Sequence, residues 1–369
     1  MNQRVKFINK DKSEFFSTLK KRVDDYFATN NISRNANKLM ISKTIVMLLM
    51  YFVPLVLVFT GVATGFSFWL CWIISGLGIA GIGMSVMHDA NHGSYSSNTT
   101  LNNLMGHLVD LIGGDAGNWK IQHNVLHHAY TNIQGLDEDI DNKSILRFSP
   151  HGKHKPVHKF QIFYALFFYS IMTIYWATAK DYIQLFRYKK LGLIKEAGTS
   201  FTGKLVRITV VKIIYFTSIL WLPIYVLGFS WQGIVGGFIV MHLVAGLVLS
   251  IVFQVAHVIE EAQFPLPDSL GNIENDWAIH QLQTTADFSA GNKLLTFYVG
   301  GLNYQVIHHL FPRICHVHYP ALAPIVEKTA QEFGLKYLYF PTFGEAIRSH
   351  LRLINRLGKR EIRQLAVEM

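Results

Sequence analysis

The stretch of sequence that decides the fold runs from Thr44 to Met87 and reads TIVMLLMYFVPLVLVFTGVATGFSFWLCWIISGLGIAGIGMSVM, without any Asp, Glu, Lys or Arg. A second stretch free of these four residue types runs from Ile213 to Ile259. One crossing of a bilayer takes about 20 apolar helical residues, because roughly 30 Å is spanned at about 1.5 Å per residue. Each stretch is therefore long enough for two crossings, with turns expected at Gly61–Ser67 and Gly228–Gly233.

The composition of the 369-residue chain agrees with a membrane protein. Half of the residues are hydrophobic, only 16% are charged, and the mean hydropathy is +0.23. We predict an all-α integral membrane protein with four transmembrane helices in two hairpins and a cytoplasmic helical cap. The four helices are expected at about 44–64, 67–87, 208–228 and 234–256.

A third apolar run, residues 160–179, is also long enough to cross the bilayer. A crossing here would place the basic loop 180–204 outside, against the preference of Lys and Arg for cytoplasmic loops. The run is rich in Phe, Tyr and Trp, which favour the membrane interface. We therefore predict an interfacial or shallow re-entrant helix.

The distribution of basic residues predicts the topology and three regions. Lys and Arg are frequent before residue 44, in the central loop and toward the C-terminus, which predicts that both termini and the active site are cytoplasmic. The predicted regions are a cytoplasmic N-terminal segment, a central domain and a cytoplasmic C-terminal tail, at residues 1–43, 44–326 and 327–369. The polar N-terminus is not typical of a cleavable signal peptide. The net charge of +10 suits anionic lipid head groups and an acidic protein partner, and no further feature favours nucleic-acid binding.

The two cysteines, Cys71 and Cys315, are far apart in the sequence and form no CxxC site. We expect both to be small buried residues rather than a disulfide or a metal site.

Seventeen histidines are present, and their clustering is more informative than their number. His88 and His92 are four residues apart and would share one face of a helix that continues out of the first hairpin. The predicted topology brings the clustered histidines to one face of the membrane. They are His88, His92, His123, His127, His128, His257, His308 and His309.

Neutral imidazole is a good ligand for Fe, Zn, Cu and Ni. A mononuclear catalytic site needs about three protein ligands and an open position, so eight histidines together with Gln305 are too many for one ion. Two metal ions are the economical interpretation. The other histidines are expected to be less directly involved: His151, His154 and His158 solvated, His316, His318 and His350 solvated or beside the ligands, and His242 hydrogen-bonded within a helix.

At this point the chain resembles a known family. Its boxes HDxxH, HxxxHH and QxxHH, with the run GGLNYQVIHHLFP at residues 300–312, are similar to those of membrane fatty acid desaturases. The glutamine that opens the third box is typical of the front-end subgroup, which includes Δ6 (linoleoyl-CoA), Δ5 and sphingolipid Δ8 enzymes. The resemblance runs from about His88 to Val326.

The resemblance implies two non-haem iron ions and O₂ as co-substrate. The eight clustered histidines would then be both catalytic and iron ligands, and Gln305 would stand where other desaturases place a histidine ligand. Further residues are expected to hold the ligands in place or to contact substrate: Asp89, His107, Trp119, Asp137, Asp139, His280 and Asn303. Asp110 and Asp115 are further candidates to accept hydrogen bonds from the ligand rings.

The implied activity is insertion of a cis double bond into a fatty acyl chain, held as acyl-CoA or as acyl-lipid. The sequence lacks the His-Pro-Gly-Gly haem motif of a fused cytochrome b5 domain, so we expect electrons from a separate ferredoxin or cytochrome b5. Bond position, chain length, acyl carrier and oligomeric state stay open at this stage.

Three alternatives remain at the level of sequence. A membrane hydroxylase of lipid or carotenoid substrates shares the metal chemistry, although the QxxHHLFP run disfavours it. A membrane zinc metalloprotease is prompted by the likeness of HDANH to HExxH, but Asp89 replaces the usual glutamate base and the other histidines are left unused. A metal transporter would place its ionisable ligands inside the spans rather than at their ends.

Overall fold

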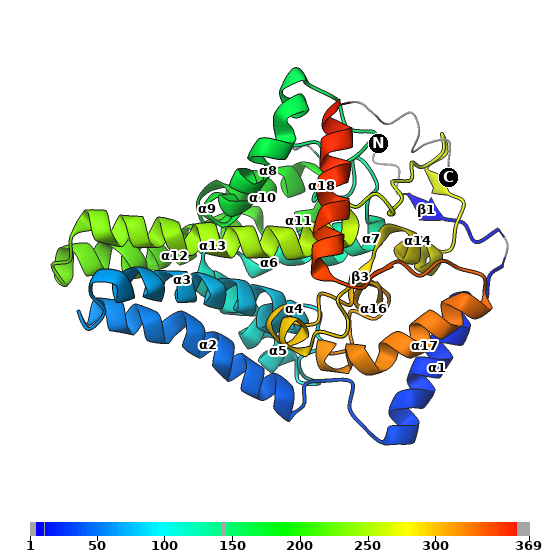
Figure 1. The fold of residues 1–369 in the computed structure, drawn as a ribbon, viewed down its shortest axis with the longest axis horizontal. Coiled ribbons are helices and arrows are strands. Elements are labelled where there is room, and N and C mark those ends of the chain that lie inside the picture. Colours follow the sequence, from blue (N-terminus) through cyan, green and yellow to red (C-terminus); the bar gives the residue numbers. More distant parts are fainter. Residues whose placement is uncertain (1–4, 11, 142–144, 360–369) are drawn as a thin grey trace. The chain divides into compact units, whose positions relative to one another are not determined.

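The computed structural model describes residues 5–10, 12–141 and 145–359. The chain divides into two compact units, which we name the membrane unit (residues 38–121 and 167–250) and the histidine unit (residues 1–37, 122–166 and 251–369). Both units are mostly helical, which confirms the predicted fold class in its coarse form (Figure 1). Residues 1–4 and 360–369, parts of the two predicted terminal segments, lie outside the described residues.

The membrane unit is built from long apolar helices and the short elements that join them. Its elements are α2 (Lys38–Phe59), α3 (Gly65–Gly81), η1 (Ile82–Val86), α4 (Met87–Asn91), α5 (Thr99–Gly106), η2 (His107–Ile112), α6 (Ala116–Lys120), α9 (Met172–Tyr175), η5 (Trp176–Lys180), α10 (Asp181–Lys190), α11 (Leu193–Glu196), α12 (Phe201–Phe216), η6 (Thr217–Val226) and α13 (Trp231–His257), of which the last turns belong to the histidine unit.

Among the described residues, four helical segments are long and apolar enough to cross a membrane: Lys38–Phe59, Gly65–Asn91, Phe201–Val226 and Trp231–His257. The prediction of four membrane-spanning helices is confirmed at this level. A fifth apolar segment is not straight, because Pro156–Ser170 and Met172–Lys190 meet at an angle of 55°. The location of this broken segment in the membrane interface, or as a shallow re-entrant helix, stays a prediction.

Helices α2 and α3 pack side by side because small residues let their backbones approach (Figure 1). A Cβ atom added at Gly78 of α3 would lie 2.6 Å from the backbone nitrogen of Tyr51 on α2, which is too close for any side chain. One turn away, the Ser75 hydroxyl donates to the Tyr51 carbonyl at 3.1 Å. The turn between the helices is closed by a bond from the Thr64 amide to the Ser67 hydroxyl. The first hairpin therefore has both a close interface and a capped turn.

A buried ion pair ties α12 to α10 within the membrane unit. Lys212 is 4% exposed and its ammonium group donates to the Asp181 carboxylate at 2.8 Å. Three backbone carbonyls, those of Gly113, Trp176 and Ala177, accept from the same ammonium group at 2.9–3.0 Å. A charge in an apolar unit is tolerated only with such partners. Lys212 thus joins three segments that are distant in sequence.

The histidine unit consists of shorter elements around one apolar core. Its elements are β1 (Lys6–Phe7), α1 (Phe15–Asn30), η3 (Ile121–His127), α7 (His128–Tyr130), η4 (Pro156–Phe160), α8 (Gln161–Ser170), β2 (Asn272–Ile273), α14 (Trp277–Thr284), β3 (Asp287–Phe288), α15 (Lys293–Tyr298), α16 (Gln305–Leu310), η7 (His316–His318), α17 (Tyr319–Glu332), β4 (Tyr339–Phe340) and α18 (Phe343–Lys359).

Helices α1 and α17 lie side by side and bury a common apolar core (Figure 1). Phe15 and Leu19 of α1 and Leu322 of α17 are fully buried there, together with Val306 and Ile307 of α16. The apolar residues of α16 thus fix the helix that carries the third histidine box. Two parallel pairs of two-residue strands, β1 with β2 and β3 with β4, were not predicted.

We expect Asp181→Ala to destabilise the protein strongly, because it leaves the Lys212 charge buried without its partner, at a cost of about 3–5 kcal/mol. The matched control is Asp24→Ala, which removes an exposed pair with Arg34 worth about 0–1 kcal/mol. The midpoint of thermal unfolding, monitored by size-exclusion chromatography in detergent, is compared between the two variants. A midpoint for Asp181→Ala no lower than that of the control would contradict the structural role of the pair.

Candidate metal centre

Three buried imidazoles from distant parts of the chain converge within the histidine unit. His127 ends η3, His257 ends α13 and His309 lies on α16. One ring nitrogen from each lies within 4.8 Å of the others. None of the three residues is more than 1% exposed. This is the number and type of ligand that a catalytic metal site uses.

Each of the three rings is fixed at its Nδ1 atom by an oxygen acceptor. His127 Nδ1 lies 3.1 Å from the Asp137 carboxylate. His257 Nδ1 lies 3.3 Å from the carbonyl of Thr284, and His309 Nδ1 lies 2.8 Å from the side-chain oxygen of Gln281. An acceptor at Nδ1 places the proton there and leaves the lone pair of Nε2 available for a metal.

The Nε2 atoms of His127, His257 and His309 are all buried and have no hydrogen-bond partner among the described residues. A buried polar atom without a partner is costly, and three such atoms on neighbouring rings need an explanation. A metal ion satisfies all three at once. The residues present therefore fit a metal ion.

The pKa values of His309 and His127 are shifted in opposite directions. Burial, together with the neighbouring rings of His128, His257, His127 and His123, holds the pKa of His309 well below its usual value, so the ring is neutral at neutral pH. Burial lowers the pKa of His127, but the charge and hydrogen bond of Asp137 more than offset this and raise it. The pKa of Asp137 is lowered in turn, since His127 and two backbone amides outweigh the effect of its burial. Asp137 is thus a carboxylate that orients the ring.

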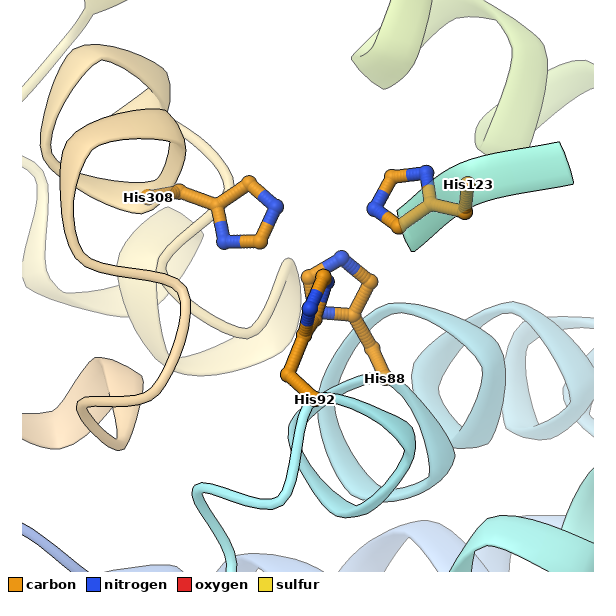
Figure 2. A group of neighbouring side chains, drawn as sticks. All are labelled: His88, His92, His123 and His308. Carbon is orange, nitrogen blue, oxygen red and sulfur yellow. The ribbon is translucent and has the colours of Figure 1, made fainter. Parts of the chain in front are cut away.

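A second group of ring nitrogens lies beside the first. His128 Nε2 is 3.2 Å from His123 Nε2 and 3.0 Å from His308 Nε2. Ligand atoms of His128, His308 and His309 also lie within 4.8 Å of one another. The rings of His123 and His308 are nearly parallel, with centroids 5.8 Å apart (Figure 2). Outside this group, Tyr319 places its hydroxyl 3.2 Å from His308 Nδ1.

The two His–His pairs in the sequence explain why there are two groups. Successive residues on a helix leave its axis about 100° apart, so the adjacent side chains of His308 and His309 have different neighbours. The His308 ring lies against those of His123 and His128, whereas the His309 ring lies against those of His127 and His257. The His309 ring also stacks on that of His128, with centroids 4.3 Å apart. One helical turn therefore contributes to both groups.

The second box lies mostly on a π-helical segment, η3. The wider turn changes the relation of residues four apart, and the rings of His123 and His127 are stacked with centroids 5.4 Å apart. Short π-helical segments occur frequently at functional sites.

His88 and His92 form a pair within the membrane unit. Their ring centroids are 4.8 Å apart at the end of α4, as the helical spacing predicted (Figure 2). The Trp119 ring stands edge-on to both, at 5.5 and 5.7 Å. Asp89 has a carboxylate oxygen 3.8 Å from His88 Nδ1.

The remaining predicted residues of the histidine unit lie around these ligand groups. His280 is buried and bonds the Thr131 carbonyl at 2.9 Å, and burial lowers its pKa to about 4. Asp139 accepts a bond from Gln122 at 2.6 Å and lies 3.7 Å from His127 Nδ1. Gln305 begins α16 and buries its side-chain oxygen without a hydrogen-bond partner among the described residues.

Asn303 stabilises the loop before α16. Its side-chain amide donates to the Thr296 hydroxyl at 2.9 Å, and its backbone carbonyl accepts from the backbone amide of Phe288 at 2.9 Å. This fixes the turn that leads into the third histidine box.

Two predicted hydrogen-bond partners of the ligand rings are engaged elsewhere. Asp110 and Asp115 both form short ion pairs with Arg207, and His107 joins the same cluster, 3.0 Å from Asp110 and 2.8 Å from the guanidinium group. The prediction was wrong for these two carboxylates because proximity in sequence to the boxes did not reveal the arginine nearly a hundred positions later.

The predictions for the peripheral histidines were partly wrong. His158 is 1% exposed and accepts a bond from the Lys155 amide at 3.0 Å. His154 and His151 bond the carbonyls of Gly358 and Phe264, each at 2.7 Å, so none of the three is simply solvated. Of the group expected to be solvated or beside the ligands, all three members are buried: His316, His318 and His350.

Two other predictions are confirmed. His242 lies mid-helix and bonds the Tyr215 hydroxyl at 2.7 Å and the Thr173 hydroxyl at 3.1 Å. Both cysteines, Cys71 and Cys315, are free and buried.

Three residues that contact the clustered histidine rings were not among the predicted site residues. The Thr284 carbonyl is a backbone group and leaves no signature in a residue type. Gln281 orients His309 and also donates to the carbonyl of His128 at 3.3 Å, while Tyr319 approaches His308. The spacing of Gln281 beside His280 on α14 was the available hint, and it is a weak one.

Comparison with known proteins finds a matching family model and similar proteins that match over most of the chain. The family model described as "Fatty acid desaturase" matches residues 63–341. The chain is 36% identical to an sn-1 linoleoyl-lipid 6-desaturase of Synechocystis sp., covering 97% of this chain and 98% of the relative. It is 32% identical to an acyl-lipid (8-3)-desaturase of Physcomitrium patens and 33% identical to Delta(5) fatty acid desaturase A of Dictyostelium discoideum, over 97% and 96% of this chain and 75% and 76% of the relatives.

We expect Gln281→Ala to lower metal affinity about 10- to 100-fold, because groups that orient a ligand imidazole typically contribute that much. Metal content of the purified protein, measured by mass spectrometry after titration with a competing chelator, tests this. The control is Gln331→Ala on α17, an exposed residue whose side-chain amide donates to the Glu327 carboxylate. Equal metal retention in both variants would exclude Gln281 from the centre.

Proposed function

The chain belongs to the fatty acid desaturase family, and on this premise we propose that it introduces a cis double bond at position 6 of linoleoyl chains esterified in membrane lipids. It is an oxidoreductase that resembles front-end desaturases over nearly its whole length. The two relatives named as sn-1 linoleoyl-lipid 6-desaturases are each 36% identical and covered over 98% and 92% of their length. The Δ5 and (8-3) relatives are 30–33% identical and covered over about three quarters. This difference favours position 6 and a lipid carrier.

The observation that carries the proposal is the convergence of six buried histidines in two adjoining groups, with three unsatisfied Nε2 atoms in one of them. We propose that this centre binds two iron ions. His127, His257 and His309 would hold one of them. His123, His128 and His308 are proposed ligands of the other, with His88, His92 and Gln305 as further ligands on the strength of the family likeness.

The overall reaction fixes what must be supplied. A CH₂–CH₂ unit loses two hydrogens as it becomes CH=CH, and O₂ becomes two waters. The reduction of O₂ to two waters takes four electrons and four protons. The substrate supplies two of the electrons and two of the protons. Two electrons must come from a donor and two protons from water. Iron would supply the O₂ activation that breaking an unactivated C–H bond requires.

The protein's own residues set the conditions for that chemistry. The carboxylate of Asp137, the Gln281 amide oxygen and the Thr284 carbonyl each hold one ligand ring at Nδ1 and so fix where its Nε2 points. The near-complete burial of these groups excludes water, which limits unproductive reduction of O₂. A rigid centre also selects which carbon of a bound chain lies within reach.

We propose a separate ferredoxin or cytochrome b5 as the electron donor. We also propose that the centre, the N-terminal segment 1–43 and the C-terminal tail 327–369 face the cytoplasm. Support for this orientation comes from the absence of Lys and Arg in the two hairpin turns and their frequency elsewhere.

We expect His309→Ala and His128→Ala each to abolish formation of the new double bond, because each removes a ring that contacts both ligand groups. The assay is expression in a host without polyunsaturated fatty acids, feeding of linoleate, and mapping of double bonds in the extracted lipids. His242→Gln, which changes a mid-helix histidine of the membrane unit outside both ligand groups, is the matched control and should retain product. Desaturation by either alanine variant would overturn the assignment, and a hydroxylated product from wild type would point to a hydroxylase.

The proposed carrier has its own test. Purified enzyme in nanodiscs should desaturate dilinoleoyl lipid, with the new bond mainly at the sn-1 position, and should convert linoleoyl-CoA at a rate at least about tenfold lower. Faster conversion of linoleoyl-CoA would show that the carrier is the thioester.

A further inference from the structure

Helix α18 (Phe343–Lys359) is strongly amphipathic, and its apolar side is buried inside the histidine unit. Ala346, Leu353, Ile354 and Leu357 are at most 1% exposed. The apolar side is therefore already used in packing. An amphipathic helix that binds a membrane surface instead presents that side to lipid.

The opposite side of α18 is basic. Arg348, Arg352, Arg356 and Lys359 recur at intervals of four, four and three, so they lie within one stripe along the helix. The Arg352 side chain is 64% exposed. Arg356 pairs with Glu260 at 2.9 Å, and the helix itself contains one acidic residue, Glu345.

A basic loop lies beside the C-terminal half of this helix. His154 and Arg147 bond the carbonyls of Gly358 and Leu357, at 2.7 and 2.9 Å. These contacts place the loop His151–Lys159, which contains no acidic residue, along α18. Its three lysines are exposed. We define the basic face as Lys153, Lys155, Lys159, Arg348, Arg352, Arg356 and Lys359.

The inner side of α18 contacts the segment that follows a proposed iron ligand. His350 Nδ1 lies 2.7 Å from the carbonyl of Val258, the residue after His257. The Ser349 hydroxyl accepts from the Glu260 amide at 3.0 Å. One helix, about 10 Å across, thus separates the basic face from the backbone beside His257.

We propose that the basic face docks an acidic electron-carrier protein, an iron–sulfur or haem protein whose surface is rich in carboxylates. The inference rests on the proposed function, which requires two electrons from a donor for each double bond. A one-electron carrier must then bind and leave twice per turnover. Such encounters use small interfaces, under about 1,200 Å² in total, and charge complementarity supplies their rate and orientation. The packing of α18 on the residues after His257 makes this face a short route to the centre.

The test is a fourfold variant that removes exposed charge and leaves both arginines that pair with Glu260, Arg352 and Arg356, in place: Lys153→Gln, Lys155→Gln, Lys159→Gln and Arg348→Gln. The control removes the same charge from exposed lysines of the same unit but outside the basic face: Lys20→Gln, Lys21→Gln, Lys328→Gln and Lys336→Gln. Both are purified as full chains in neutral phosphatidylcholine nanodiscs. Desaturation is measured against the concentration of reduced ferredoxin and, separately, of reduced cytochrome b5.

We expect the basic-face variant to raise the KM for whichever donor supports turnover by about tenfold, with kcat within twofold of wild type and a weaker dependence of kcat/KM on salt. The control should keep wild-type values. Equal KM in the two variants would overturn the proposal, and so would a lower kcat with unchanged KM. An effect of the basic-face variant that appears only in anionic phosphatidylglycerol nanodiscs would overturn it in favour of a lipid-binding face.

A binding measurement separates failure of this proposal from failure of the proposed function. Oxidised donor is titrated onto immobilised nanodiscs, which needs no turnover. Weaker binding to the basic-face variant than to the control supports docking even if wild type shows no desaturase activity. Unchanged binding, with an active wild type, overturns docking and leaves the desaturase assignment intact.

Discussion

The candidate metal centre depends on one constraint: a buried neutral histidine offers its Nε2 lone pair to a metal when its proton is on Nδ1 and is hydrogen-bonded to an acceptor there. His127, His257 and His309 each meet that condition through a different oxygen, a carboxylate, a backbone carbonyl and a side-chain amide. Because the rings are buried, their acceptors must also be buried, which is why α14, with Gln281 and Thr284, packs against the segments that carry the ligands. The packing of the histidine unit follows from satisfying those three protons.

Adjacent histidines make economical use of this arrangement. If each of these two helical turns contributed only one histidine, two further elements would be needed to supply the second group. The pairs His127–His128 and His308–His309 instead use the 100° step of a helix to direct neighbouring rings to different groups. His308 lies against His123 and His128, and His309 lies against His127 and His257. The HH dipeptides are thus a geometric consequence of placing two groups side by side.

The sequence predicted features that follow from composition and local spacing. Charge-free stretches revealed the hairpins, because burial in lipid excludes unpaired charges along the whole length of a span. The four-residue interval predicted that His88 and His92 would be neighbours. Predictions about isolated side chains were less successful. His158 was expected to be solvated and His350 to be solvated or beside the ligands, yet both are buried, and His350 bonds the carbonyl of Val258 in a distant segment. Asp110 and Asp115 were assigned to the ligands, although Arg207 binds them. Such partners depend on packing between distant segments, which local patterns do not encode.

Charge is handled differently at the two places where it meets an apolar environment. Lys212 is enclosed and has four oxygen partners, so its charge is neutralised within the membrane unit and is not available to a ligand. On α18 the apolar residues are enclosed and the arginines face outward. Burying the apolar side fixes the helix backbone, so the helix itself loses no further freedom when its guanidinium groups meet carboxylates. Since a carrier must also dissociate quickly to deliver the second electron, a surface that gains rate from long-range attraction, and little from apolar burial, suits repeated one-electron encounters better than a deep interface.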